Sequence, residues 1–443
     1  MQTFAQRVGR SPLVFILALA ALAACADDPA SPVIPTIDRP NAAVGDMYFV
    51  TTKSGGTEVG SLRWAVAQTT TGGEFIKFAP DLAGDTIVLD STLVIKHPIL
   101  IEGPADKGIA ISGNGARRVI YIEPGLPSAT TLRNLSIVKG NSGYLIEGGG
   151  GVLAASDVVF ENVTLARNRG VNHAALFANT ATLINTTVSG NVSDSSGAIR
   201  GDYSLTLINS TIAHNNKGGL THGATTILRN SLIAFNGAGL NCRDTPQNME
   251  YYGRNLATDW SCGDTSRVLV ADAQIDSLRY NGGPGMTHAL ERESRAINGG
   301  KDCTVATDGR LVARDSTCDI GAFEFTDFTT LAVTPNASAA VSPLDGWVTV
   351  TGVAKCSRDE QLDVGVVVKQ EQKVGRATGI VQASGTVAVN CTTSGQVWAI
   401  ALAPTSGIFG NGTAMVEVKT ENTPRWVTPS SVSAPVKLYW GKK

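Results

Sequence analysis

The chain has 443 residues, 43% of them hydrophobic and 17% charged, so it is long and apolar enough to fold into two or three domains. Its 36 basic and 38 acidic residues leave a net charge of -2, which excludes a globally basic, nucleic-acid-binding protein. Glycine is in excess, at 48 residues or about 11% against a usual share of roughly 7%, and this predicts a fold with many tight turns.

The first 25 residues have the pattern of an export signal. Arg7 and Arg10 precede an apolar run that is too short for a bilayer crossing of about 20 residues. The run ends in Leu22-Ala23-Ala24-Cys25, which resembles the lipobox of bacterial lipoproteins. Residues 1–25 are therefore predicted to be a lipoprotein signal with the lipid on Cys25. An ordinary signal peptide with a chance cysteine is the alternative.

Residues 26–44 are rich in proline and are predicted to be a flexible tether. Asp27 lies one residue past the position at which aspartate signals retention in the inner membrane, so we expect an exported protein on the outer membrane or cell surface. The lipid then makes the membrane its first partner.

A short helix and irregular strands precede the regular part of the chain. Gly60 to Ala67 has the pattern of a Ser-capped amphipathic helix, which can plug the open end of a repeat fold and protect its strand edges. Residues 75–122 contain short aliphatic segments, which we interpret as the first and least regular coils of that fold.

From residue 130 a short sequence motif recurs, in which an asparagine lies between two aliphatic segments. The asparagines of successive copies are 28, 23, 24 and 21 residues apart. A second aliphatic column runs in phase with it, so two strands per repeat predict a parallel β-solenoid. A leucine-rich repeat would need more leucines and a helical half. We expect the asparagines to form a ladder at the corners, where they tolerate left-handed geometry, which favours a structural role over glycosylation. The ladder residues are Asn134, Asn162, Asn185, Asn209 and Asn230.

Four copies of the motif close with a further asparagine three residues on, and these closing asparagines are Asn168, Asn191, Asn215 and Asn236. The residue before each of them is expected to point outward, which gives a column of Arg167, Gly190 and His214 with Phe235 at its end. Lys139 lies close by, and we call these five residues the outer column. Arg169 and Lys217 lie beside it. The candidate ligand-binding residues are therefore Arg167, Arg169, His214 and Lys217, on a basic strip suited to an acidic glycan. The alternative is that they are solvated surface side chains.

The sequence identifies no catalytic residue. No carboxylate pair joins the outer column, and the Arg-x-Pro-x-x-Arg pattern of pectate lyases is missing. His173 and His222 have no evident carboxylate partner and are interpreted as surface or turn residues. The sequence predicts no metal site, apart from Ca²⁺ as an option near four aspartates whose spacing matches no loop motif: Asp302, Asp308, Asp315 and Asp319.

Beyond Cys25, six cysteines remain, and they fall into pairs that are close in sequence. Three disulfides in an oxidising compartment explain the pairs most simply. Zinc is the alternative, but there is no Cys-x-x-Cys and no histidine at ligand spacing. The predicted pairs are Cys242–Cys262, Cys303–Cys318 and Cys356–Cys391.

Three motifs resemble a family of bacterial secreted proteins with a right-handed parallel β-helix and a choice-of-anchor Q domain. They are Ser61-Leu-Arg-Trp-Ala-Val66, Asn281-Gly-Gly-Pro284 with Thr287-His288-Ala-Leu290, and Asp308-Gly-Arg310 with Cys318-Asp-Ile-Gly-Ala-Phe-Glu324. The resemblance covers residues 45–325 and implies a right-handed helix and surface exposure, but no chemistry, and His288 is expected to fix a turn. Polymorphic outer-membrane proteins are more distant, since their Phe-x-x-Asn motif is absent.

Residues 329–443 differ in composition, with four of the six tryptophans and several alternating Val-rich segments. This pattern predicts an immunoglobulin-like β-sandwich. Trp398 and Trp426 are candidates for a sugar platform, although a core position is the more common role of tryptophan.

Two functions follow from the sequence. The first is a lipid-anchored, non-catalytic surface protein whose β-helix is a rod for adhesion, surface structure or glycan contact, with polysaccharide or other surface proteins as partners. The alternative is a carbohydrate-active enzyme, a polysaccharide lyase or hydrolase, that acts on an acidic glycan.

Overall fold

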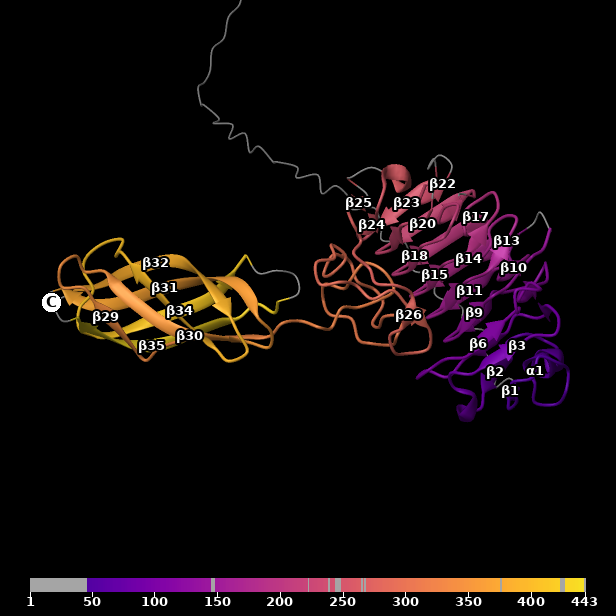
Figure 1. Cartoon of the computed structure of the whole chain (residues 1–443), viewed down its shortest axis with the longest axis horizontal. Coiled ribbons are helices and arrows are strands. Elements are labelled where there is room, and N and C mark those ends of the chain that lie inside the picture. The colour runs from indigo at the N-terminus through magenta and orange to yellow at the C-terminus, as the bar shows by residue number, and fades with distance from the viewer. Residues whose placement is uncertain are drawn as a thin grey trace, which may run out of the picture. The chain divides into compact units, whose positions relative to one another are not determined.

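The computed structural model describes residues 46–144, 148–221, 223–237, 240–243, 248–263, 266, 268–374, 377–422 and 427–441. These residues form an all-β protein with a right-handed parallel β-helix and an immunoglobulin-like β-sandwich, as predicted (Figure 1). The predictions for the signal, the tether, Cys25, His222 and Trp426 lie outside the described residues.

The β-helix is built from two parallel sheets, which we call the wide and the narrow sheet. In the earlier coils the wide sheet has two separate rows of strands. The long strands β14 and β17 extend through both rows and join them into one sheet. Its strands are β1 (Met47–Val50), β2 (Phe75–Phe78), β4 (Leu93–Ile95), β5 (Leu100–Glu102), β7 (Ile120–Ile122), β8 (Thr130–Arg133), β10 (Val152–Ala154), β11 (Val158–Glu161), β14 (Leu176–Ile184), β17 (Ile199–Ile208), β19 (Leu220–Thr221), β20 (Thr225–Arg229), β22 (Cys242–Arg243) and β23 (Met249–Tyr252).

The narrow sheet closes each coil with one strand of three residues. Its neighbours pair in register without shifts, because every coil adds the same short strand. Its strands are β3 (Thr86–Val88), β6 (Ala110–Ser112), β9 (Ser136–Val138), β12 (Thr164–Ala166), β15 (Thr187–Ser189), β18 (Thr211–Ala213), β21 (Leu232–Ala234), β24 (Asn255–Ala257) and β25 (Val268–Val270). The small pairs β13 (Arg169–Gly170) with β16 (Val192–Ser193), and β26 (Arg279–Tyr280) with β27 (Met286–Thr287), flank the coils.

The first coils carry the helical cap expected from the sequence. Helix α1 spans Leu62–Gln68, and the backbone N–H of Trp64 donates to the side chain of Ser61 at 3.1 Å. Leu62 and Ala65 are fully buried against the coil core. One-turn helices follow at η1 (Pro80–Leu82) and η2 (Trp260–Cys262). The cap therefore covers apolar surface at the first coils, where no earlier coil could.

The ladder asparagines occupy corners with left-handed backbone, at φ between 45° and 56°. The amide of Asn162 donates to Asn134 at 3.0 Å, and that of Asn185 donates to Asn162 at 3.1 Å. Further along, Asn209 and Asn230 donate instead to the backbone carbonyls of residues 319 and 301. The amide ladder thus runs over three coils, and beyond them a later segment of the chain accepts the bonds.

The closing asparagines form a second ladder that is longer and more deeply buried. Four side-chain amides each donate to the side-chain carbonyl of the next asparagine at 2.8–3.0 Å, and each of these asparagines is at most 3% exposed: Asn168, Asn191, Asn215 and Asn236. The last acceptor is Asn241, whose own amide donates to the Thr258 hydroxyl at 2.9 Å. Buried amides would destabilise the fold if they were unpaired, so the ladder holds consecutive coils in one register.

The predicted disulfides Cys242–Cys262, Cys303–Cys318 and Cys356–Cys391 are all formed. Cys242 and Cys262 link the last coil of the wide sheet to η2. Cys356 and Cys391 link two strands of the sandwich. Each bridge joins residues 15 to 35 positions apart, so each restrains a local loop and does not tie distant parts of the chain together.

The eight strands of the sandwich are hydrogen-bonded in the order β28-β30-β29-β35-β34-β31-β32, with β33 also paired to β30. β29 and β35 pair in parallel, and the other pairs are antiparallel. The Val-rich segments predicted from the sequence lie in β30 to β34, and Trp398 is a core residue at 3% exposure. The strands are β28 (Leu331–Pro335), β29 (Ser338–Val341), β30 (Val348–Cys356), β31 (Glu360–Val374), β32 (Ala377–Cys391), β33 (Gln396–Leu402), β34 (Gly412–Glu421) and β35 (Ser431–Trp440).

The register can be tested at Ile212, which lies at the centre of β18 and is fully buried. Ile212→Asp places a charge in the apolar core, so we expect the β-helix to lose more than about 4 kcal/mol of unfolding free energy. Val88→Asp, on the exposed face of β3, is the control and should cost less than about 1 kcal/mol. Equal melting temperatures for the two variants would contradict the register.

Candidate functional site

The outer column runs along one edge of the narrow sheet. Lys139, Arg167, Gly190, His214 and Phe235 directly follow five neighbouring strands that pair in register, and each has left-handed backbone with φ between 51° and 64°. His214 stacks on Phe235 with ring centroids 5.3 Å apart. Because Gly190 has no side chain, the column splits into a cationic pair, Lys139 and Arg167, and an aromatic pair.

The other two candidate residues, Arg169 and Lys217, are exposed and do not extend this cationic pair. Arg169 lies on β13 and forms an ion pair with Asp194 at 3.5 Å. Lys217 lies in a turn, where its backbone carbonyl accepts a hydrogen bond from Arg243 at 3.0 Å. The structure therefore does not join all four predicted binding residues into one continuous strip.

A segment C-terminal to the coils covers much of the narrow sheet's outer face, and we call residues 272–325 the cover segment (Figure 1). The hydroxyl of Thr164 donates to the carbonyl of Met286, and Thr211 accepts from the backbone N–H of Ala322, both at 2.9 Å. Its apolar residues Ile297, Ile320 and Phe323 join a core cluster with residues of β18, β21 and β24. The outer faces of β3, β6 and β9 lie outside that cluster.

His288 fixes the cover segment to the coils. Its Nδ1 lies 2.7 Å from the carbonyl of Asp276, so Nδ1 carries the proton, and its Nε2 accepts from the Ser189 hydroxyl at 2.9 Å. Burial lowers the pKa of His288 from 6.5 to about 4, and burial also lowers the pKa of His214, whose ring lies 5.2 Å away. His288 is 2% exposed, so it is a buried residue that joins the cover segment to β15 by hydrogen bonds.

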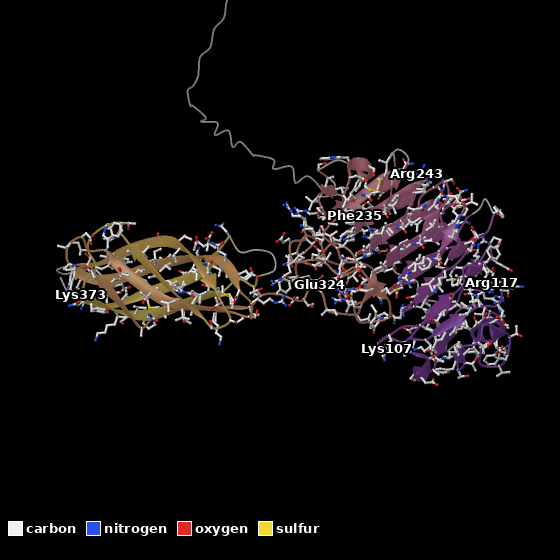
Figure 2. All side chains as sticks on the ribbon, viewed as in Figure 1. Lys107, Arg117, Phe235, Arg243, Glu324 and Lys373 are labelled. Atoms are coloured by element: carbon white, nitrogen blue, oxygen red, sulfur yellow. A yellow bond between two sulfur atoms is a disulfide. The ribbon has the colours of Figure 1, made fainter. Side chains whose placement is uncertain are left out.

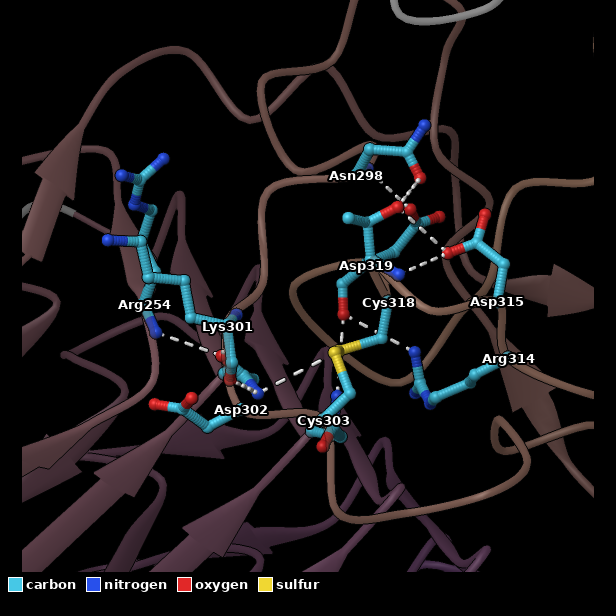
Figure 3. Close-up of a disulfide and its surroundings, with 12 residues drawn as sticks. Arg254, Asn298, Lys301, Asp302, Cys303, Arg314, Asp315, Cys318 and Asp319 are labelled. Atoms are coloured by element: carbon cyan, nitrogen blue, oxygen red, sulfur yellow. Dashed lines mark hydrogen bonds between the residues drawn. A yellow bond between two sulfur atoms is a disulfide. The ribbon is translucent and has the colours of Figure 1, made fainter. Parts of the chain in front are cut away.

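Of the four aspartates considered for Ca²⁺, the carboxylates of Asp308, Asp315 and Asp319 have structural partners instead (Figure 3). Asp315 and Asp319 lie on one side of the Cys303–Cys318 disulfide, and Asp302 lies on the other. Asp319 accepts from the backbone N–H groups of residues 298 and 325, and Asp308 bonds Arg310 and three backbone N–H groups. Among the described residues no His, Cys, Asp or Glu group is arranged to hold a metal.

A buried ionic network surrounds these carboxylates. Arg314 and Glu324 pair at 2.8 Å with side chains only 2% and 3% exposed. Burial raises the pKa of Asp319 to about 8, with the nearby Glu324 adding to the effect, and burial raises the pKa of Glu324 as well. The network ties residues 308–325 together, so the Asp308-Gly-Arg310 and Cys318 to Glu324 segments have a structural role.

These two buried sites predict opposite effects of pH on stability. Between pH 4 and 6.5 the unfolded chain protonates His288 before the folded protein does, so this residue alone makes stability rise with pH, by on the order of 3 kcal/mol. Asp319 stays protonated longer in the folded protein, so its contribution falls as pH rises above 3.8. In the wild type the two effects oppose each other.

The variant His288→Gln separates these effects. Urea unfolding at several values between pH 4 and 6.5 should show that the wild type gains stability relative to this variant as pH rises. Parallel pH profiles for the two proteins would show that His288 is not held neutral in the fold.

A cavity of about 280 Å³ lies beside the β26–β27 hairpin, over β3, β6 and β9. Three of its lining side chains are the cations Lys107, Lys139 and Arg167, and no lining residue is acidic. Figure 2 shows Lys107 at the margin of the β-helix. We call this cavity the basic pocket; its lining residues are Gly84, Thr86, Lys107, Ile109, Ala110, Ser112, Ser136, Val138, Lys139, Arg167, Tyr280, Pro284, Gly285 and Met286.

The wall of the basic pocket is held in place by two contacts. The hydroxyl of Tyr280 donates to the carbonyl of Asp106 at 2.8 Å. Gly108, at φ 59°, lies so close to the carbonyl of Pro284 that an added Cβ would come within 1.8 Å of its oxygen. The turn before β6 and the β26–β27 hairpin therefore pack against each other.

The pocket's cations differ from the cation at the centre of the wide sheet. On the wide sheet, Arg133 lies between Glu102 at 3.4 Å and Glu161, each on a neighbouring coil. Within the described part of the chain, Lys107, Lys139 and Arg167 form no ion pair. These three charges are therefore uncompensated by the fold.

A second cavity of about 280 Å³ beside α1 is also lined by cations, but they have partners. The Arg63 guanidinium donates to three backbone carbonyls, including that of Thr92 at 3.1 Å. Lys96 lies 3.9 Å from Glu123. The cations of this cavity are therefore already bonded within the fold, and the basic pocket is the stronger candidate site for an anionic ligand.

The sequence interpretation found two of the three pocket cations and missed Lys107 and Tyr280. Lys107 lies in an irregular turn outside the repeat, and Tyr280 reaches the pocket from a segment more than a hundred residues away. Trp398, the described sugar-platform candidate, is buried in the sandwich core. His173 is also buried, with its Nδ1 3.3 Å from the Ser196 hydroxyl.

No family model matches the sequence, and no curated protein matches it. Among the described residues, no helix has the length and hydrophobicity of a membrane span. The site therefore has to be interpreted from its own geometry.

Proposed function

We propose that the chain is an exported, lipid-anchored bacterial surface protein whose β-helix holds an acidic glycan without cleaving it. Three disulfides support an oxidising compartment. The motif ending in Cys25 and the resemblance to choice-of-anchor Q proteins support export and surface display. The sandwich then serves as a spacer or adhesive module.

The observation that carries the glycan role is the set of uncompensated cations in the basic pocket. Hydrolysis of a glycosidic bond usually needs two carboxyl groups placed on either side of the bond. The pocket offers cations, hydroxyls and an aromatic ring, and none of its lining residues is acidic. This composition suits binding of an anionic ligand better than hydrolysis.

A panel of polysaccharides tests this function. We expect the soluble chain without residues 1–25 to bind polygalacturonate or alginate, to ignore neutral dextran, and to lose affinity as salt rises, because screening weakens the attraction. Products are checked by reducing ends and by absorbance of unsaturated sugars. Binding without products supports the proposal, whereas products of either kind would assign the protein to the lyases or hydrolases instead.

The anchor is tested by Cys25→Ser in the full chain. Without the thiol no lipid can be attached, so we expect the protein to move from the membrane fraction to the soluble exported fraction. Metabolic labelling with a fatty acid should mark only the wild type. Continued sedimentation of the variant with membranes would contradict lipid anchoring at Cys25.

A further inference from the structure

We propose that the basic pocket is the glycan-binding site and takes one sugar unit that carries a negatively charged group. This inference rests on the proposed function and makes it specific, because it assigns the residues and the ligand class. It excludes Arg169 and Lys217 from the site, although they lie beside the same column.

The charged residues of the pocket lie at the two ends of the short strands that line it. Gly108 and Ala110 precede and begin β6, whereas Lys139 follows β9, which pairs with β6. Lys107 therefore approaches from one end of the short strands, and Lys139 and Arg167 approach from the other. Arg167 and Lys139 lie on adjacent coils, one strand spacing of about 4.8 Å apart, so both can contact the same anionic group.

The remaining lining suits a sugar ring. Thr86, Ser112 and Ser136 bring hydroxyl groups to the pocket, and Tyr280 brings an aromatic ring that its bond to Asp106 holds in place. Aromatic faces pack against the apolar faces of ligands, while hydroxyl groups exchange hydrogen bonds with polar ones. A volume of about 280 Å³ lies just below the roughly 300–1,000 Å³ of sites for drug-sized molecules, so one sugar unit fits better than a long peptide.

Nothing in the fold needs the pocket to be basic. Some cations elsewhere on the coils face carboxylates, such as Lys53 with Asp85 at 3.3 Å and Lys77 with Glu102 at 3.2 Å. Three unmatched positive charges around one cavity repel one another, and an anionic ligand relieves that repulsion. A low-dielectric wall formed by Ile109, Val138 and Met286 strengthens the attraction.

The test uses the exported chain and trigalacturonate as the probe, measured by calorimetry. The pocket variant is Lys139→Asn with Arg167→Asn, because asparagine tolerates the left-handed backbone at φ 51° and 57°. The control is Lys53→Gln with Lys96→Gln, which removes the same charge from lysines that already face carboxylates. We expect affinity to fall by about tenfold or more in the pocket variant and by less than about twofold in the control.

Further ligands identify the charged group and the ring. The methyl ester of trigalacturonate keeps the sugar and loses the charge, so it should bind at least about tenfold more weakly. A sulfated galactan trisaccharide shows whether sulfate replaces carboxylate. Tyr280→Ala should weaken both sugars and leave poly-L-glutamate unaffected. If poly-L-glutamate binds as well as the sugar, the pocket recognises charge alone and the sugar assignment is wrong.

The failures of the two proposals are distinguishable. If the wild type, the pocket variant and the control all bind trigalacturonate equally, glycan binding stands and the pocket assignment fails. If the wild type binds no acidic sugar, carboxylated or sulfated, the proposed function itself fails. Thermal melting of each variant confirms that it is folded before its affinity is compared.

Discussion

The whole β-helix depends on one constraint: each coil must turn its corner at the same residue, so that the next coil can pair with it in register. Left-handed backbone at Asn134, Asn162 and Asn185 makes that turn, and the buried amides of the second ladder hold it. An L-residue other than asparagine or glycine adopts this backbone at a cost. The two asparagine columns therefore set the pitch on which every other feature of the β-helix is built.

The outer column follows from the same constraint. Its residues also have left-handed backbone, yet they include lysine, arginine, histidine and phenylalanine, which gain no local stability there. Strained positions that carry bulky or charged side chains are common at functional sites. The cover segment packs over the later coils, and Lys139 and Arg167 lie beside it at the basic pocket.

Local patterns made the coils, the cap, the disulfides and most strands of the sandwich predictable, because their contacts repeat within about 30 residues. Strands β28, β29 and β35 were missed. β28 and β35 each contain a proline, Pro335 or Pro435, which weakens a strand pattern, and β29 has only four residues. The basic pocket could not be predicted, since Tyr280 and Lys107 meet across 173 residues. Register along the column found Arg167, but it could not show that Arg169 turns to Asp194.

The position of the cover segment in the chain sets an order of folding. Consecutive coils pair over short loops, so they can stack one after another from the N-terminal coil onward. Leu232 and Leu256, on the outer face of the narrow sheet, are exposed to water until the cover segment packs against them. One face of the β-helix is therefore apolar and exposed until the cover segment packs on it. The basic pocket is complete only when Tyr280 has packed against the coils.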